Sequence, residues 1–182
     1  MSMSAPASGL PGAPFSPIEL LEYVRFVAEE VRGGQYLVGF DSARRWHQRL
    51  YRDRRVDLWL ISWLPSQGTQ LHDHGGSAGA FTVLAGTLTE TIARPGTSRA
   101  RPALVERRWP TGAGVAFGAH HVHDVGNQAG SPAVSVHAYS PPLTSMTFFD
   151  LDPAGGLRRL AAVATDDPES VPPGALGNTS AA

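Results

Sequence analysis

The stretch QLHDHGGSAGAFTVLAGTLTE, residues 70–90, has two histidines one residue apart, followed by an apolar run that glycines interrupt. In a β-strand, residues i and i+2 point to the same face, so His72 and His74 would project into one space while Asp73 points away. Burying two polar imidazoles costs free energy unless they are paired or bind a ligand, and neutral imidazole is a common metal ligand. The pair therefore favours a metal site, which needs a third ligand.

The segment HHVHDVGN, residues 120–127, offers that third ligand. On a strand, His121 and His123 would share a face and His120 would oppose them, but the pattern alone leaves all three open. The sequence contains no cysteine, which excludes disulfides, thiolate nucleophiles and cysteine-based zinc sites. Any metal must therefore bind to histidine, carboxylate or backbone oxygen.

Short apolar or alternating segments, separated by Gly, Pro and Asn, make up most of the chain after residue 55. RVDLWLISWL, residues 55–64, is apolar on both faces and predicts a buried strand, and TQLHDH, residues 69–74, is also expected to be a strand. Strands this short and this close together are typical of an all-β fold, either a sandwich or a barrel.

A single helix is expected before these strands. Ser16 is a candidate N-cap, Pro17 suits the first helical position and Glu19 completes a capping box, which predicts a helix over residues 17–32. We expect one domain to cover residues 16–163. Disordered tails rich in Ala, Ser, Pro and Gly are expected over residues 1–15 and 164–182.

The composition fits a soluble globular protein of one domain, with 42% hydrophobic and 17% charged residues among 182. A formal net charge of -1 gives no reason to expect nucleic acid or a membrane surface as a partner. The sequence shows neither an apolar run long enough to span a bilayer nor a secretory signal. We therefore expect a cytoplasmic protein that is a monomer or a weak homo-oligomer.

The region around the first two histidines resembles the first motif of the cupin superfamily. After H-x-H, the spacing from His74 to Gly79 and on to Gly86 matches that motif, and the H-x3-N ending of the second cupin motif is matched by His123 and Asn127. Many cupins carry a glutamate ligand where Gly79 stands. The resemblance therefore implies a cupin-type β-barrel, jelly-roll-like, with a metal site of three histidines.

Within the cupins, the chain resembles the thiol dioxygenases, whose type member is cysteine dioxygenase. Their first motif, H-D-H-x2-S, is matched over residues 72–77. Their late motif, S-x-H-x-Y-S-P-P, is matched without a break by SVHAYSPP, residues 135–142. The two motifs agree in order and distance, and the resemblance covers residues 45–150.

This resemblance implies an enzyme that adds both atoms of O2 to the sulfur of a small thiol, with L-cysteine as the expected substrate and cysteine sulfinate as the product. The implied cofactor is Fe(II), and the implied ligands, with His120 and His121 outside the ligand set, are His72, His74 and His123. Three alternatives stay open: a dioxygenase of 3-mercaptopropionate or another small thiol, a cupin with different metal-dependent chemistry, and a non-enzymatic metal-binding cupin.

The late motif also suggests a catalytic relay. Ser135, His137 and Tyr139 are spaced at period two and would share one face of a strand, where they could form a hydrogen-bonded chain that delivers the Tyr139 hydroxyl to the metal. The alternative is a polar face directed to solvent. In mammalian-type relatives a cysteine at the position of Gly79 is cross-linked to the tyrosine, so here Tyr139 must act as a free phenol. The Ser140–Pro141 bond resembles one that is cis in the family.

The substrate carboxylate needs a partner, which is an arginine in a Y-x-R context in cysteine dioxygenases. The corresponding segment here is RRWHQRLYRD, residues 44–53. Aligning His47 with the tyrosine makes Arg49 the carboxylate partner. Aligning Trp46 with it makes Gln48 the partner instead, which resembles the 3-mercaptopropionate dioxygenases. We expect Arg49 to bind the carboxylate.

Overall fold

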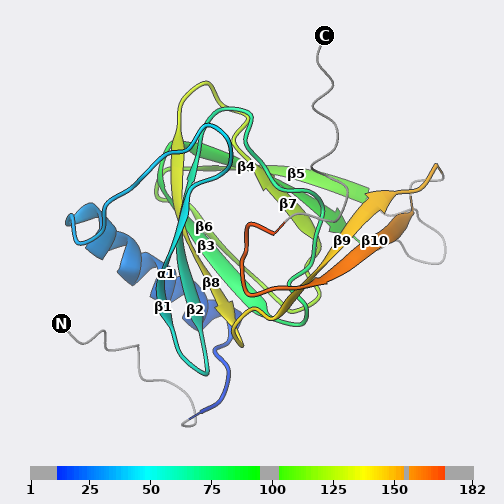
Figure 1. The fold of residues 1–182 in the computed structure, drawn as a ribbon, viewed down its shortest axis with the longest axis horizontal. Coiled ribbons are helices and arrows are strands. Elements are labelled where there is room, and N and C mark those ends of the chain that lie inside the picture. Colours follow the sequence, from blue (N-terminus) through cyan, green and yellow to red (C-terminus); the bar gives the residue numbers. More distant parts are fainter. Residues whose placement is uncertain (1–11, 95–102, 154–155, 171–182) are drawn as a thin grey trace.

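The structure is a computed structural model that describes residues 12–94, 103–153 and 156–170. Most of the expected tails, residues 1–11 and 171–182, lie outside the described residues. Within the described part, one helix precedes ten strands, so the expected all-β class is confirmed (Figure 1). No helix in this part is long and apolar enough to cross a membrane.

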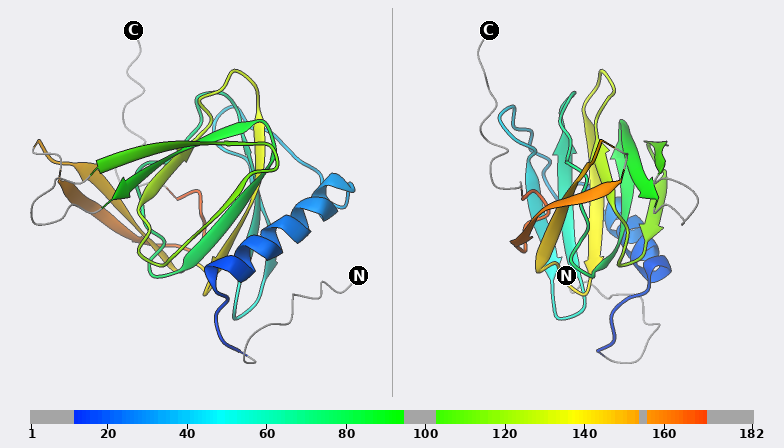
Figure 2. Two further views of the ribbon diagram at one scale, coloured as in Figure 1. Left: turned by 180° about the vertical axis from the view of Figure 1, so that it is seen from behind. Right: turned by 90° about the vertical axis from the view of Figure 1, so that its right-hand side faces the viewer.

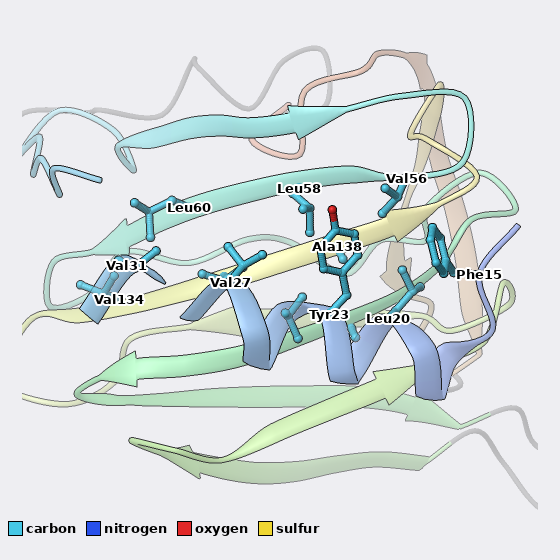
Figure 3. Close-up of a cluster of buried hydrophobic side chains, with 13 residues drawn as sticks. Phe15, Leu20, Tyr23, Val27, Val31, Val56, Leu58, Leu60, Val134 and Ala138 are labelled. Atoms are coloured by element: carbon cyan, nitrogen blue, oxygen red, sulfur yellow. The ribbon is translucent and has the colours of Figure 1, made fainter. Parts of the chain in front are cut away.

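The helix α1 spans Pro17–Arg32, as the sequence predicts. Ser16 caps it by accepting a hydrogen bond from the backbone N–H of Glu19, and the Glu19 carboxylate accepts one from the backbone N–H of Ser16. This capping box satisfies two backbone donors at the helix start. The apolar stripe of the helix is buried against the sheet, as Figure 3 shows for Leu20, Tyr23, Val27 and Val31.

The strands form a five-stranded sheet, a three-stranded sheet and a hairpin. The five-stranded sheet has the order β1-β2-β8-β3-β6, the three-stranded sheet has the order β5-β4-β7, and the hairpin pairs β9 with β10. Helix α1 lies across the outer face of the five-stranded sheet, and the other strands face the opposite side of that sheet (Figure 2). The strands are β1 (His47–Arg52), β2 (Asp57–Trp63), β3 (Ala78–Ala85), β4 (Thr87–Arg94), β5 (Ala103–Pro110), β6 (Gly114–Phe117), β7 (His123–Gly126), β8 (Ala133–Ser140), β9 (Ser145–Leu151) and β10 (Leu157–Ala164).

The two central strands, β2 and β8, are buried on both faces. In β2, Leu58 and Leu60 belong to the apolar layer under α1, whereas Trp59 belongs to a second cluster inside the barrel. In β8, Ala138 lies in the layer under the helix and Tyr139 lies in the barrel cluster. The alternation of side chains along a strand therefore separates a structural face from a face that lines the barrel interior.

The segment of residues 69–74, expected to be a strand, is not one. It makes only isolated bridges, in which His72 pairs with His123 of β7 on one side and with Phe148 of β9 on the other. The carboxylate of Asp73 accepts hydrogen bonds from the backbone N–H groups of Gly75 and Thr147, which turns the chain away from a regular ladder. The segment still joins β7 to β9, and it places both of its histidines inside the barrel.

Candidate metal centre

Three histidines, His72, His74 and His123, meet inside the barrel. One ring nitrogen of each lies within 4.8 Å of the corresponding nitrogen of the other two. The ring centroids of His72 are 4.9 Å from His74 and 5.0 Å from His123. The backbones of His72 and His123 also exchange hydrogen bonds of 2.8 and 3.0 Å, so the loop before β3 and the first residue of β7 are fixed against each other.

Hydrogen bonds determine which ring nitrogens remain available. The Nδ1–H of His72 donates to the carbonyl oxygen of Gln70 at 2.7 Å, and the Nδ1–H of His123 donates to a carboxylate oxygen of Glu90 at 2.7 Å. Both rings therefore keep an Nε2 lone pair for a ligand. The Nε2 of His74 is buried without a hydrogen-bond partner among the described residues. A buried nitrogen in this state needs a partner that a metal ion would provide.

The three imidazoles are held in the neutral form that metal binding requires. Burial, with help from the neighbouring histidines, lowers the pKa of His72 and of His74 well below the usual value. Burial also lowers the pKa of His123, although Glu90 opposes the shift. Three neutral nitrogen donors suit a first-row transition metal such as iron and do not suit Mg²⁺ or Ca²⁺, which prefer oxygen ligands.

Glu90 of β4 supports one side of this cluster. It is fully buried, and its carboxylate accepts hydrogen bonds from the ring N–H groups of His123 and His121 and from the indole N–H of Trp109. Burial opposes ionisation of Glu90, but these hydrogen bonds outweigh it and lower its pKa to about 2. The carboxylate is therefore ionised and orients the His123 ring.

The other two histidines of the HHVH segment have different surroundings. His120 is exposed. His121 bonds to Glu90 at 2.9 Å, and a second group of possible ligands, Glu90, His121 and His123, lies within 4.8 Å. Since His123 would need its Nδ1 for that second group, and Glu90 already accepts the proton on this nitrogen, the first group is the better metal site. His121 then supports Glu90.

Phe117 explains the glycine at position 79. A Cβ added to Gly79 would come within 2.4 Å of the Phe117 ring, so this ring fills the space where a side chain at 79 would project. The same ring stacks on both His74 and His121, with centroid distances of 5.1 and 4.8 Å. Neither a fourth ligand nor a cross-linking residue at position 79 fits without moving Phe117.

The expected relay residues all face the barrel interior and are buried. The indole N–H of Trp63 donates to the Ser135 hydroxyl at 2.8 Å, and that hydroxyl lies 2.8 Å from Nε2 of His137. Burial lowers the pKa of His137 to about 3, so the ring is neutral and shares one hydrogen bond with the Ser135 hydroxyl through its Nε2. Among the described residues, no hydrogen bond joins His137 to the hydroxyl of Tyr139.

Tyr139 approaches the histidines directly. Its ring centroid is 4.9 Å from that of His74, and it lines a small chamber together with His72, His123 and His137. Burial raises the pKa of Tyr139 further above its ordinary value, so the phenol stays protonated and can donate a hydrogen bond. The solvent-facing alternative for this strand is therefore wrong. The Ser140–Pro141 peptide bond is cis, as the resemblance implies.

The two candidates for the substrate carboxylate lie elsewhere. Arg49 pairs in register with Trp59 and its guanidinium stacks on that ring at 4.3 Å, whereas Gln48 pairs with Leu60 and is exposed. Arg49 also forms ion pairs with Asp57 at 3.1 Å and Asp166 at 2.9 Å. Neither Arg49 nor Gln48 is among the residues that line the chamber over the histidines.

A different guanidinium, that of Arg45, is buried next to this chamber. It stacks on Trp63 at 5.1 Å and forms an ion pair with Glu169, whose side chain lines the chamber. Burial raises the pKa of Glu169 to about 7, although Arg45 opposes the shift. Glu169 belongs to residues 165–170, here named the strap, which follow β10 and fall in the region expected to be a disordered tail. Figure 1 shows the strap, coloured red, turning back across the middle of the barrel.

Sequence reasoning missed the second layer of this site. The missed residues are Arg45, Trp63, Glu90, Trp109, Phe117 and Glu169. Each lies in a segment whose residue pattern indicates only apolar or charged character and contains no ligand motif at that position. The role of each comes from contacts between positions far apart in the chain, such as the 72 residues that separate Trp63 from Ser135.

Comparisons with known proteins agree with this geometry. The family model for cysteine dioxygenase type I matches residues 27–152. A zebrafish (Danio rerio) protein, cysteine dioxygenase type 1, is 28% identical over 103 residues, which cover 53% of this chain and 50% of the zebrafish protein. The chain therefore matches only about half the length of that curated relative.

Solved structures agree on the fold. A Klebsiella pneumoniae protein with a double-stranded β-helix domain has a TM-score of 0.50 at 12% identity, covering 74% of this chain and 88% of its own. A recombinant oxalate oxidase in complex with glycolate has a TM-score of 0.52 at 15% identity, covering 63% of this chain and 60% of its own. At these identities the likeness is one of fold, and it confirms a cupin-type barrel.

Proposed function

Because the chain belongs to the cysteine dioxygenase type I family, we propose that it is a thiol dioxygenase that uses Fe(II) held by His72, His74 and His123. The substrate would be a small thiol, with L-cysteine first among the candidates, and the product its sulfinic acid. The observation that carries the proposal is the meeting of three neutral imidazoles, two of which line the same chamber as Tyr139 and His137.

The donor set supports the choice of metal. Three uncharged nitrogen ligands would leave the charge of an iron(II) ion largely uncompensated, which favours binding of a thiolate and O2 there. Bound there, the ion would supply the acidity that deprotonates the thiol and the redox chemistry of the reaction with O2. The Phe117 ring closes the side of position 79, which supports a site limited to three protein ligands.

The residues of the chain would do the rest. Tyr139 would donate its phenolic hydrogen bond toward the reacting oxygen and sulfur atoms, and the apolar walls of the chamber would exclude water around them. The Trp63–Ser135–His137 chain fixes the His137 ring beside Tyr139, so His137 is a positioning residue for that edge of the site. Glu90 holds the His123 ring with Nε2 directed at the metal position.

A panel of thiols tests the proposal. We expect the protein reconstituted with iron(II) to consume oxygen with L-cysteine, or with 3-mercaptopropionate or cysteamine, in a ratio of one O2 per thiol lost. An oxygen electrode combined with chromatography of the products gives that ratio and identifies the sulfinate. Retention of zinc, nickel or manganese without thiol-dependent oxygen uptake after iron loading would instead indicate another cupin chemistry or a metal-binding protein.

A further inference from the structure

The chamber over the three histidines is closed in this structure. Its volume is about 10 Å³, room for at most about one water molecule, so a thiol substrate cannot fit without a rearrangement. Next to it lies an outer groove of about 380 Å³, lined by Arg45, His47, Asp167 and Glu169. Glu169 lines both spaces, and its side chain is therefore part of the wall that divides the groove from the histidines.

The strap that carries Glu169 is attached to one edge of the barrel by a row of charges. Arg45, His47 and Arg49 alternate along the chain at the start of β1, which is the spacing that places side chains on one face. Arg45 binds Glu169, Nε2 of His47 lies 3.4 Å from Asp167, and Arg49 lies 2.9 Å from Asp166. Arg52 adds a second contact to Asp166 at 3.0 Å.

The ion pairs at Asp166 and Asp167 are weak enough to break and let the strap move. Asp166 and Asp167 are 58% and 46% exposed, and exposed ion pairs contribute little to stability. Pro168 is the one residue of the strap that is buried as a whole, and Glu169 is buried only in its side chain. Segments with few buried apolar contacts open locally at much lower free-energy cost than the core. The Arg45–Glu169 pair, with both side chains buried, is then the main attachment on the inner side.

We propose that residues 165–170 are a closing strap over the metal centre, and that Glu169 is an internal carboxylate ligand of Arg45 that must leave before a thiol enters from the outer groove. The identity of the entering molecule as a thiol rests on the proposed function. A substrate that bears a carboxylate would replace Glu169 on Arg45, exchanging one carboxylate for another. Nη1 of Arg45, buried without a hydrogen-bond partner among the described residues, is a donor available to that substrate.

Hydrogen exchange of the metal-free protein, followed by mass spectrometry, tests the strap without any turnover. The backbone N–H groups of Thr165, Asp167 and Glu169 are bonded within or beside the strap, so its closure protects them. In Glu169→Gln we expect these amides to exchange about tenfold faster, while those of β8 keep their wild-type rate. The matched control is Asp150→Asn, which removes an acid from a surface ion pair with Arg158 and should leave the strap unchanged.

Kinetics of the iron-loaded protein with L-cysteine give the second measurement. If only the open protein binds substrate, the apparent affinity is the intrinsic affinity multiplied by the open fraction. Glu169→Gln should increase the open fraction and so lower the KM by up to about tenfold. Arg45→Gln should also speed exchange in the strap, but should raise the KM because it removes the guanidinium that the substrate carboxylate takes. If Glu169→Gln does not fold, Asp166→Asn should shift exchange and KM in the same direction by a smaller factor.

Three outcomes would overturn the strap. The first is exchange of the strap amides at the unprotected rate in the wild type. The second is an unchanged exchange rate of these amides in Glu169→Gln. The third is a KM raised by Glu169→Gln, which would make Glu169 a fixed part of the binding site. Absence of oxygen uptake with every thiol would refute the proposed function instead. In that case the exchange rates alone would still decide whether the strap opens.

Discussion

Replacing His123 with alanine is expected to abolish iron retention and, with it, all thiol-dependent oxygen uptake. His123 supplies one of three ring nitrogens that lie within 4.8 Å of one another, and two imidazoles alone leave the metal without a stable set of ligands. Iron per chain, measured by plasma mass spectrometry after reconstitution and desalting, should fall from about one to near zero.

Two further variants should have smaller effects on iron binding than His123→Ala. Glu90→Gln keeps the size of the side chain but removes the charge that orients His123. It should lower the metal affinity by about 10- to 100-fold. His120→Ala, at an exposed position, should retain iron like the wild type. Loss of iron in His120→Ala together with retention in His123→Ala would show that a different histidine is the third ligand.

Removing the hydroxyl of Tyr139 is expected to have the second-largest effect. Tyr139→Phe keeps the ring that packs 4.9 Å from His74, so iron content should not change. The reacting atoms lose a hydrogen-bond donor, which can cost about 2–4 kcal/mol in the transition state, or roughly 30- to 1,000-fold in kcat. Oxygen consumed without sulfinate formed should rise, as a comparison of oxygen uptake with product yield will show.

Tyr51→Phe is the matched control for this substitution. The Tyr51 hydroxyl donates to Asp53 in an exposed hydrogen bond and Tyr51 does not line the chamber, so kcat should stay at its wild-type value. A Tyr139→Phe variant with wild-type kcat and wild-type coupling would contradict a role for the phenol. Loss of iron from that variant would instead assign Tyr139 to the integrity of the metal site.

The sequence predicts the parts of this site that depend on local spacing. The capping box at Ser16 and Glu19 fixes the start of α1, and the alternation in β8 places Ser135, His137 and Tyr139 on one face of the strand. Local spacing did not predict the course of residues 69–74, where the side chain of Asp73 holds the backbone out of a regular strand.

The remaining parts depend on contacts between distant segments, which no local pattern encodes. Glu90 reaches His123 across 33 residues of the chain, and Arg45, which precedes β1, meets Glu169, which follows β10. The composition after residue 164 is typical of a tail and gives no sign of the contacts that residues 165–170 make with the cations of the β1 edge. The spacing of residues 44–53 favours Arg49 as the carboxylate partner, which stays a prediction, whereas the buried guanidinium beside the chamber is that of Arg45.

Oxygen isotope labelling tests the central claim most directly. The iron-loaded protein is incubated with L-cysteine, or with the thiol that gives the highest rate, under ¹⁸O₂ in unlabelled water. The mass of the product is then measured by mass spectrometry. A thiol dioxygenase places both atoms of one O2 molecule on the sulfur, so the sulfinate should carry two ¹⁸O atoms. A product with one labelled atom or none, or a disulfide formed while oxygen is consumed, would contradict the account.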